Sequence, residues 1–154
     1  MLRKKIDTAL KAAMKARDDK ARVSTLRLIN AAIKDRDIAA RSEDRCDGIT
    51  DPEIFSILSK MVKQREDSAQ AYDSGCRPDL AEKERVEISV IQEFLPKQMD
   101  DAAVKEVVDK TVAELNATSL KDMGRCMALL KDRHTGELDF GKAGALMKKV
   151  LGAG

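Results

Sequence analysis

Residues 94–99, Phe94-Leu95-Pro96-Lys97-Gln98-Met99, separate two helical parts of this chain. Proline has no backbone N–H and its ring pushes the preceding residue out of the α region, so Leu95 is expected to end a helix. The side chain of Asp100 can then cap the next helix. We therefore predict a hinge at Leu95 and Pro96, between an N-terminal domain of residues 1–95 and a C-terminal domain of residues 96–154.

The composition indicates an all-α protein. Of 154 residues, 43% are hydrophobic, 36% are charged and only 3% are aromatic, which favours amphipathic helices over strands. The basic first residues are not followed by an apolar segment like that of a signal peptide, and no apolar run approaches the length that spans a bilayer. We predict a cytoplasmic protein without a membrane partner.

Four helices are expected in the N-terminal domain. Apolar residues recur at three- and four-residue steps over residues 2–17 and 23–40. Thr50 and Glu53 form a capping-box pattern that starts a third helix, and Gly75 is expected to end it in the left-handed conformation. Asp79 and Glu82 then predict a cap for a fourth helix that stops at Pro96. These helices can form either a bundle or an extended hairpin.

Three helices are expected in the C-terminal domain, and they predict a three-helix bundle. Asp100, Ser119 and Asp139 are the predicted N-caps, with helices reaching Asn116, Arg133 and Leu151. Inside the last helix, Gly141 and Gly144 each cost about 1 kcal/mol relative to Ala. Close packing against Gly124 or Ala128 of the neighbouring helix would explain them, and so would a backbone brought close to a ligand or an RNA phosphate.

Charge is distributed unevenly along the chain. Residues 1–36 contain eleven Lys or Arg and four Asp or Glu, whereas residues 37–95 contain eight and fourteen. This division indicates either ion pairs between packed helices or a basic surface that faces a polyanion. The second interpretation predicts a secondary basic face made of Arg22, Arg27, Lys34 and Arg36.

Catalytic and metal-binding patterns are absent from the sequence. His134 is the only histidine, and no nucleophile elbow, P-loop or zinc-binding helix motif occurs. Cys46, Cys76 and Cys126 are widely spaced, which indicates reduced thiols without a metal or disulfide role. We expect no cofactor, no metal and no enzymatic activity from this chain by itself.

The C-terminal domain has its own basic residues. Residues 119–151 contain seven Lys or Arg and four Asp or Glu. A surface of this kind could hold a phosphate backbone with strong salt dependence, or it could be an ordinary solvated face. The candidate nucleic-acid-binding residues lie largely outside the apolar stripes and are Lys121, Arg125, Lys142, Lys148 and Lys149.

Several stretches together resemble the YqeY-like family of small bacterial proteins, over essentially the whole chain. They are residues 24–29 (STLRLI), 60–68 (KMVKQREDS), 94–98 (FLPKQ), 121–124 (KDMG) and 139–143 (DFGKA). In that family the final third is similar to the tail domain of the B subunit of the glutamine-dependent aspartyl/glutamyl-tRNA amidotransferase. The resemblance implies an all-helical fold and a C-terminal module associated with holding tRNA.

The resemblance also implies a link to carbon–nitrogen ligation with glutamine as the amide donor. No residues here could replace the catalytic centres of such an enzyme, so an amidotransferase label would be inherited from the tail. The leading hypothesis is a non-enzymatic tRNA-binding or RNA-binding accessory protein. The alternative is a protein-interaction scaffold whose N-terminal helices recruit a partner or a second copy.

Overall fold

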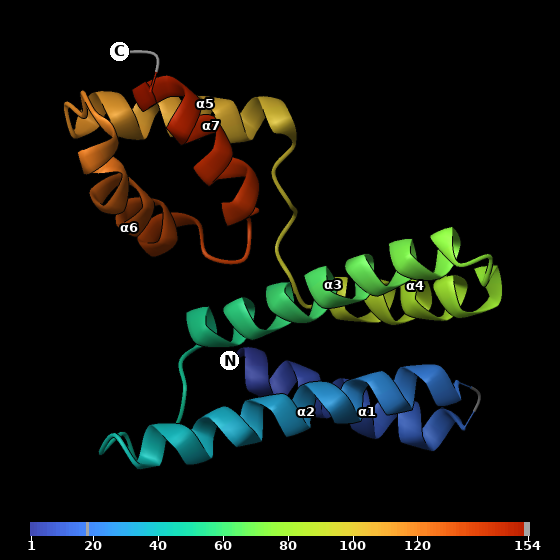
Figure 1. Ribbon diagram of the computed structural model, residues 1–154. Coiled ribbons are helices and arrows are strands. Elements are labelled where there is room, and N and C mark those ends of the chain that lie inside the picture. Colours follow the sequence, from blue (N-terminus) through green and yellow to red (C-terminus); the bar gives the residue numbers. More distant parts are fainter. Residues whose placement is uncertain (18, 153–154) are drawn as a thin grey trace. The chain divides into compact units, whose positions relative to one another are not determined.

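The chain is all-helical, as the composition predicts. A computed structural model describes residues 1–17 and 19–152, and no strand occurs in those ranges (Figure 1). The chain divides into two compact units, an N-terminal unit of Met1–Pro96 and a C-terminal unit of Lys97–Gly154. The elements are α1 (Leu2–Ala16), α2 (Lys20–Arg41), α3 (Asp51–Ser74), α4 (Pro78–Gln92), α5 (Asp101–Glu114), the 3₁₀-helix η1 (Leu120–Asp122), α6 (Met123–His134) and α7 (Phe140–Gly152).

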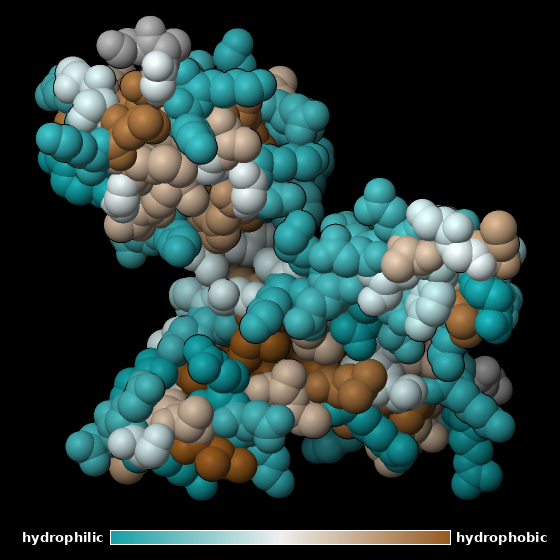
Figure 2. Space-filling model, in the orientation of Figure 1, coloured by the Kyte–Doolittle hydropathy of each residue, from teal (hydrophilic) through white to brown (hydrophobic). Residues whose placement is uncertain are grey.

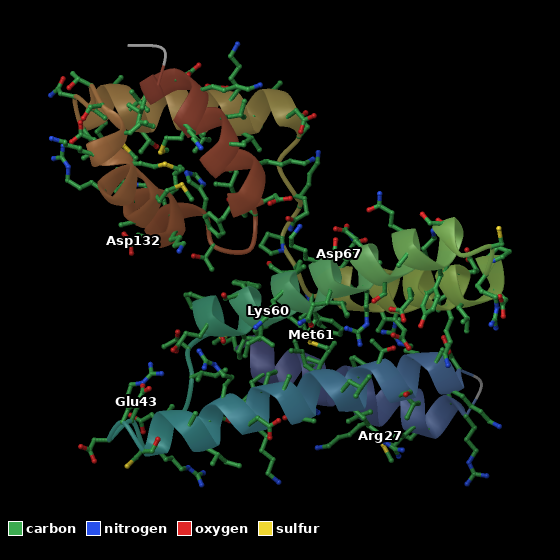
Figure 3. All side chains as sticks on the ribbon, in the orientation of Figure 1. Arg27, Glu43, Lys60, Met61, Asp67 and Asp132 are labelled. Carbon is green, nitrogen blue, oxygen red and sulfur yellow. The ribbon has the colours of Figure 1, made fainter. Side chains whose placement is uncertain are left out.

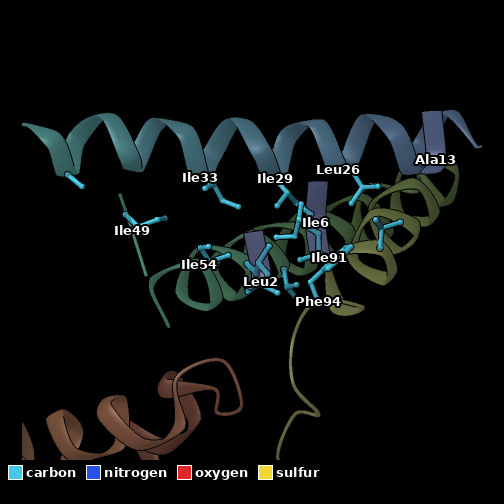
Figure 4. Packing of buried hydrophobic residues seen from close by; sticks show 14 residues of the cluster. Leu2, Ile6, Ala13, Leu26, Ile29, Ile33, Ile49, Ile54, Ile91 and Phe94 are labelled. Atoms are coloured by element: carbon cyan, nitrogen blue, oxygen red, sulfur yellow. The ribbon is translucent and has the colours of Figure 1, made fainter. Parts of the chain in front are cut away.

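The N-terminal unit consists of two helix pairs that pack face to face. Helix α1 lies beside α2, and α3 lies beside α4, with apolar side chains between the pairs (Figures 1 and 4). On the visible side of this unit, apolar residues reach the surface along the seam between the pairs, while hydrophilic residues cover most of the rest (Figure 2). The fully buried side chains that fill this core are Ile6, Leu26, Ile29, Ile54, Leu58 and Ile91.

Two helix starts show how local sequence sets the fold. Asp19 accepts a hydrogen bond from the backbone N–H of Arg22 at 2.8 Å, so α2 begins at Lys20, three residues earlier than predicted. The capping box before α3 is confirmed, with the carboxylate of Glu53 2.8 Å from the backbone nitrogen of Thr50.

The turn between α3 and α4 differs from the prediction. Gly75 has φ −86°, and the left-handed residue is Cys76 with φ 57°. The predicted cap from Asp79 and Glu82 is also wrong, because the Asp79 carboxylate accepts hydrogen bonds from the Arg77 guanidinium instead. Helix α4 starts at Pro78, whose missing N–H is not needed in the first turn.

Helix α4 ends at Gln92, three residues before the predicted end at Leu95. The backbone nitrogens of Phe94 and Leu95 bond to the carbonyls of Ile91 and Gln92, at 3.1 and 3.2 Å. This three-residue spacing tightens the last turn and directs Phe94, which is 5% exposed, into the core. Leu95 packs against the same core, so the side chain of one predicted hinge residue belongs to the N-terminal unit.

The C-terminal unit is formed by α5, α6 and α7, with η1 leading into α6. Its core contains Val104, Val108, Cys126, Leu130, Ala143 and Met147, all at most 2% exposed. Two predicted caps are confirmed: Asp100 accepts from the nitrogen of Ala103, and Asp139 accepts from that of Gly141. The segment that leads into this unit is fixed by a 2.8 Å hydrogen bond from the backbone nitrogen of Met99 to the carbonyl oxygen of Glu137.

The glycines of this unit are not explained by close packing. A Cβ on Gly124 would meet no atom within 4 Å, and one on Gly144 would make ordinary contacts with Met123 and Met127, at 3.7 and 3.9 Å. A Cβ on Gly141 would approach only its neighbour Asp139, at 3.1 Å. The Cβ positions of these glycines therefore show no close approach of Gly124 to Gly141 or Gly144.

Within residues 1–17 and 19–152, no helix is both long enough and apolar enough to cross a bilayer.

Candidate nucleic-acid interface

The five candidate residues of the C-terminal unit lie on three successive elements. Lys121 is in η1, Arg125 is in α6, and Lys142, Lys148 and Lys149 are in α7. All five side chains are exposed. Helix α7 contacts both η1 and α6, so these elements form neighbouring parts of one small bundle.

Ion pairs reduce the positive charge of two candidates. The Arg125 guanidinium lies 2.6 Å from the Asp122 carboxylate, and this contact and the backbone N–H of Thr118 lower the pKa of Asp122. Lys142 Nζ lies 3.4 Å from the carboxylate of Asp101. Among the described residues, no carboxylate pairs with the three remaining candidates, Lys121, Lys148 and Lys149.

The α7 lysines do not form a single stripe. Lys142 and Lys149 are seven residues apart, or about two turns, so they share one side of the helix. Lys148 is rotated by about 100° from Lys149. The three lysines of α7 therefore spread around its exposed half, an arrangement that can reach phosphates but does not define a groove.

The secondary basic face is split by the phase of α2. Arg27 and Lys34 are about two turns apart and share a side, whereas Arg36 lies about two and a half turns beyond Arg27, on the opposite side. Arg22 pairs with Glu93, the residue directly after α4, with 2.7 Å between their charged groups. The four basic residues Arg22, Arg27, Lys34 and Arg36 therefore do not share one side of α2.

Internal pairing explains little of the N-terminal charge. Arg3 pairs with Asp37 and Arg22 with Glu93, so two of the eleven Lys and Arg in residues 1–36 have a carboxylate partner among the described residues. The other nine leave α1 and α2 with a largely uncompensated positive surface. They are Lys4, Lys5, Lys11, Lys15, Arg17, Lys20, Arg27, Lys34 and Arg36.

Two exposed apolar residues were not recognised as surface residues from the sequence. Met14 belongs to the apolar pattern of residues 2–17 but is 48% exposed, and Leu28 of α2 is 46% exposed. Both border a groove between α1 and α2. On a helix, Leu28 is rotated by about 100° from Ile29 and by about 160° from Leu26. This rotation places Leu28 outside the buried stripe and could have been counted from the sequence.

Groups capable of catalysis are isolated from one another. Within the described residues, no cluster of three His, Cys, Asp or Glu side chains could hold a metal ion. His134 lies 3.5 Å from Glu137 in the turn after α6. Cys46 and Cys76 are exposed, while Cys126 is buried, and burial raises the pKa of its thiol.

Comparison with known proteins gives a family. The family model described as "Yqey-like protein" matches residues 3–151 of this chain. The match runs through both units and all eight helical elements.

Curated relatives come from yeasts. "Altered inheritance of mitochondria protein 41, mitochondrial" of Vanderwaltozyma polyspora is 35% identical, over 73% of this chain and 58% of its own length. Its counterpart in Lachancea thermotolerans is 33% identical, over 78% and 60%. That of Clavispora lusitaniae is 29% identical, over 92% and 80%. The chain thus spans less than two thirds of the first two relatives.

These names correct one prediction. The relatives are named as mitochondrial proteins, which contradicts the cytoplasmic location expected from the sequence. The names state no substrate, ligand or partner. Since the family model covers nearly all of the sequence, the chain belongs to the YqeY-like family.

Proposed function

We propose that this protein is a non-catalytic RNA-binding module that holds tRNA through phosphate contacts of its C-terminal unit. The observation that carries the proposal is the set of three exposed lysines without a described carboxylate partner, Lys121, Lys148 and Lys149. A free ammonium group on a long side chain can displace the counterions of a phosphate backbone. The unpaired cations of α1 and α2 add to the positive field around the molecule.

The chemistry of the surface favours backbone contacts over base recognition. The whole chain has no Trp, one Tyr and three Phe, and Phe140, the one Phe of the C-terminal unit, packs against its core. Proteins that read unpaired bases stack them on exposed aromatic side chains. We therefore expect little sequence discrimination. What favours tRNA as the RNA is the resemblance of the sequence to a family whose final third is similar to the amidotransferase tail.

A catalytic role is not proposed for the chain by itself. Its single histidine pairs with Glu137 in a turn, and its two exposed thiols lie on separate loops. Amide transfer from glutamine needs an activated nucleophile beside a base. We expect the purified protein to release no ammonia from glutamine, alone or with misacylated tRNA, and sustained release would contradict this part of the proposal.

Titration of labelled tRNA tests the binding directly. The protein should shift the fluorescence anisotropy of the tRNA at about 50 mM salt and much less at about 200 mM, because counterion release drives phosphate binding. Replacing both Lys148 and Lys149 by Glu should weaken the affinity for all tRNAs alike. The slope of log affinity against log salt should fall by about one per lysine.

A matched charge reversal controls for net charge. Lys60 and Lys63 are exposed residues of α3 in the other unit, and Lys60→Glu with Lys63→Glu makes the same change of charge (Figure 3). This variant should bind tRNA more tightly than the Lys148→Glu, Lys149→Glu variant. Equal loss in both variants would show attraction by net charge alone, and absence of binding at low salt would overturn the proposal.

A further inference from the structure

A groove runs along the outer side of the α1–α2 pair. It encloses about 770 Å³, and its α2 wall follows three- and four-residue steps over about 16 Å of helix. The residues of this wall are Lys20, Val23, Ser24, Arg27, Leu28 and Ala31. Arg27 extends on the side of α2 away from α3 and α4 (Figure 3), so the groove lies outside the core between the helix pairs.

The floor of the groove is apolar. Met14 and Leu28 are about half exposed, and Ala13, Val23 and Ala31 are the other apolar residues of the lining. Single exposed apolar residues are common on protein surfaces, but exposed apolar residues that gather in one place mark interaction sites. Met14 and Leu28 border the same groove and therefore indicate a binding surface. The flexible thioether of Met14 can adapt to the shape of a partner.

The rim of the groove is positively charged. Arg17, Lys20 and Arg27 line it, and no ion pair joins any of them to another described residue. Among the described residues of the lining, the one carboxylate is that of Asp19, which already accepts the backbone N–H of Arg22 as the N-cap of α2. Three cations around an apolar floor therefore complement a partner with carboxylates on both sides of an apolar stripe.

We propose that the α1–α2 groove binds an acidic amphipathic helix of a partner protein. A helix that packs into a groove uses apolar residues at positions i, i+3, i+4 and i+7, and three turns of such a helix match the length of this groove. The site lies in the N-terminal unit and uses none of the C-terminal lysines. It is therefore independent of the proposed contact with tRNA.

Other classes of partner fit the groove less well. Helices that lie on membranes insert a convex apolar face and carry Trp or Phe, whereas this surface is concave and no described residue of its lining is aromatic. Proteins that bind single-stranded nucleic acid stack its bases on aromatic side chains. An apolar floor between cations offers such a ligand little beyond charge.

The test uses a synthetic peptide of about 14 residues with Leu at helical spacing and Glu elsewhere, carrying a fluorescent label. The full-length protein should raise the anisotropy of this peptide. A second peptide with Lys in place of every Glu should bind about tenfold more weakly, because the rim repels it. Arg27→Glu and Leu28→Gln should each weaken binding of the acidic peptide about tenfold.

Arg36→Glu is the matched control, since it makes the same charge change on the opposite side of α2. It should leave peptide affinity within about twofold, and circular dichroism should show unchanged helicity for every variant. Failure of the acidic peptide to bind, or equal loss in Arg36→Glu and Arg27→Glu, would overturn the proposal. Binding of phosphatidylglycerol vesicles in place of the peptide, or self-association lost in Leu28→Gln, would assign the groove to a membrane or to a second copy and would also overturn it.

Discussion

The carboxylate of Asp37 accepts two hydrogen bonds from the guanidinium of Arg3, at 2.5 and 2.9 Å. The same carboxylate accepts the backbone N–H of Ile49 at 2.9 Å. Since Arg3 belongs to α1, Asp37 to α2 and Ile49 to the segment before α3, one side chain connects three parts of the N-terminal unit. The Asp37 side chain is 16% exposed, so these bonds are partly shielded from water.

Replacing Asp37 should destabilise the N-terminal unit. Asp37→Asn removes the negative charge that pairs with Arg3 and replaces one acceptor oxygen by a donor NH2 group, and hydrogen bonds to charged groups contribute about 1.5–3 kcal/mol. We expect a loss of about 2 kcal/mol in the free energy of unfolding, measured by urea denaturation. Asp35→Asn is the control: Asp35 is exposed two residues earlier on α2, and the same substitution there should change stability by less than about 0.5 kcal/mol.

Acid should destabilise the protein through two carboxylates. The Arg3 guanidinium lowers the pKa of Asp37 from 3.8 to about 2, and hydrogen bonds from Arg45 and Thr50 lower that of Glu53 from 4.5 to about 2. Because both folded values lie below the unfolded ones, their stabilising effect is complete above about pH 5 and is lost as the pH falls towards 2. Melting temperatures between pH 7 and 2 should therefore decline below pH 5.

The Asp37→Asn variant isolates one part of this pH dependence. Its melting temperature should lie below that of the parent protein at pH 7, and the difference should narrow as the pH approaches 2, where Asp37 becomes protonated in the parent as well. A constant difference across the whole range would show that Asp37 does not contribute through its charge.

Gly48 and Gly124 should respond to alanine in opposite directions. Gly48 has φ +81°, and a Cβ there would lie 2.6 Å from Oδ1 of Asp37, so Gly48→Ala should cost about 2 kcal/mol or more. Gly124 is helical with open space around its Cβ position, so Gly124→Ala should gain up to about 1 kcal/mol. Thermal unfolding of both variants measures the contrast, and a stabilised Gly48→Ala would refute the role given to the Asp37 contact.

The ion pair between Arg65 and Glu87 should matter more than its exposed neighbours. Arg65 Nε lies 3.0 Å from Glu87 Oε2 between α3 and α4, and the two side chains are 15% and 17% exposed. Glu87→Ala would leave the partly buried guanidinium of Arg65 without its carboxylate. This substitution should lower the free energy of unfolding by about 2 kcal/mol. Glu82→Ala removes a side chain that is 69% exposed and 3.8 Å from Arg85, with an expected cost below about 1 kcal/mol.

The parts of the fold that depend on neighbouring residues could be predicted from the sequence. The caps at Thr50, Asp100 and Asp139 were predictable because a side chain bonds to a backbone N–H two or three residues away. The end of α4 was not predictable in this way. It depends on the burial of Phe94 against other helices, a contact that no local pattern encodes.

The candidate interfaces show the same division. The ion pair of Arg22 joins residues 71 positions apart, so sequence alone could not remove Arg22 from the basic face. The opposite phases of Arg27 and Arg36 could have been counted once α2 was taken as one helix. Whether α1 buries Met14 depended on how the helix pair packs, and its exposure is what defines the groove.

Because Cys126 is buried in the C-terminal unit, the reactivity of its thiol measures how often this unit opens. Its side chain is 0% exposed, and burial raises the pKa of the thiol, so a thiol reagent can react only after the bundle opens. In a Cys46→Ser, Cys76→Ser variant, Cys126 is the one remaining thiol. The rate of its labelling would then measure the opening equilibrium of this unit, and any slowing by added tRNA would give the strength of binding to the same unit with unlabelled tRNA.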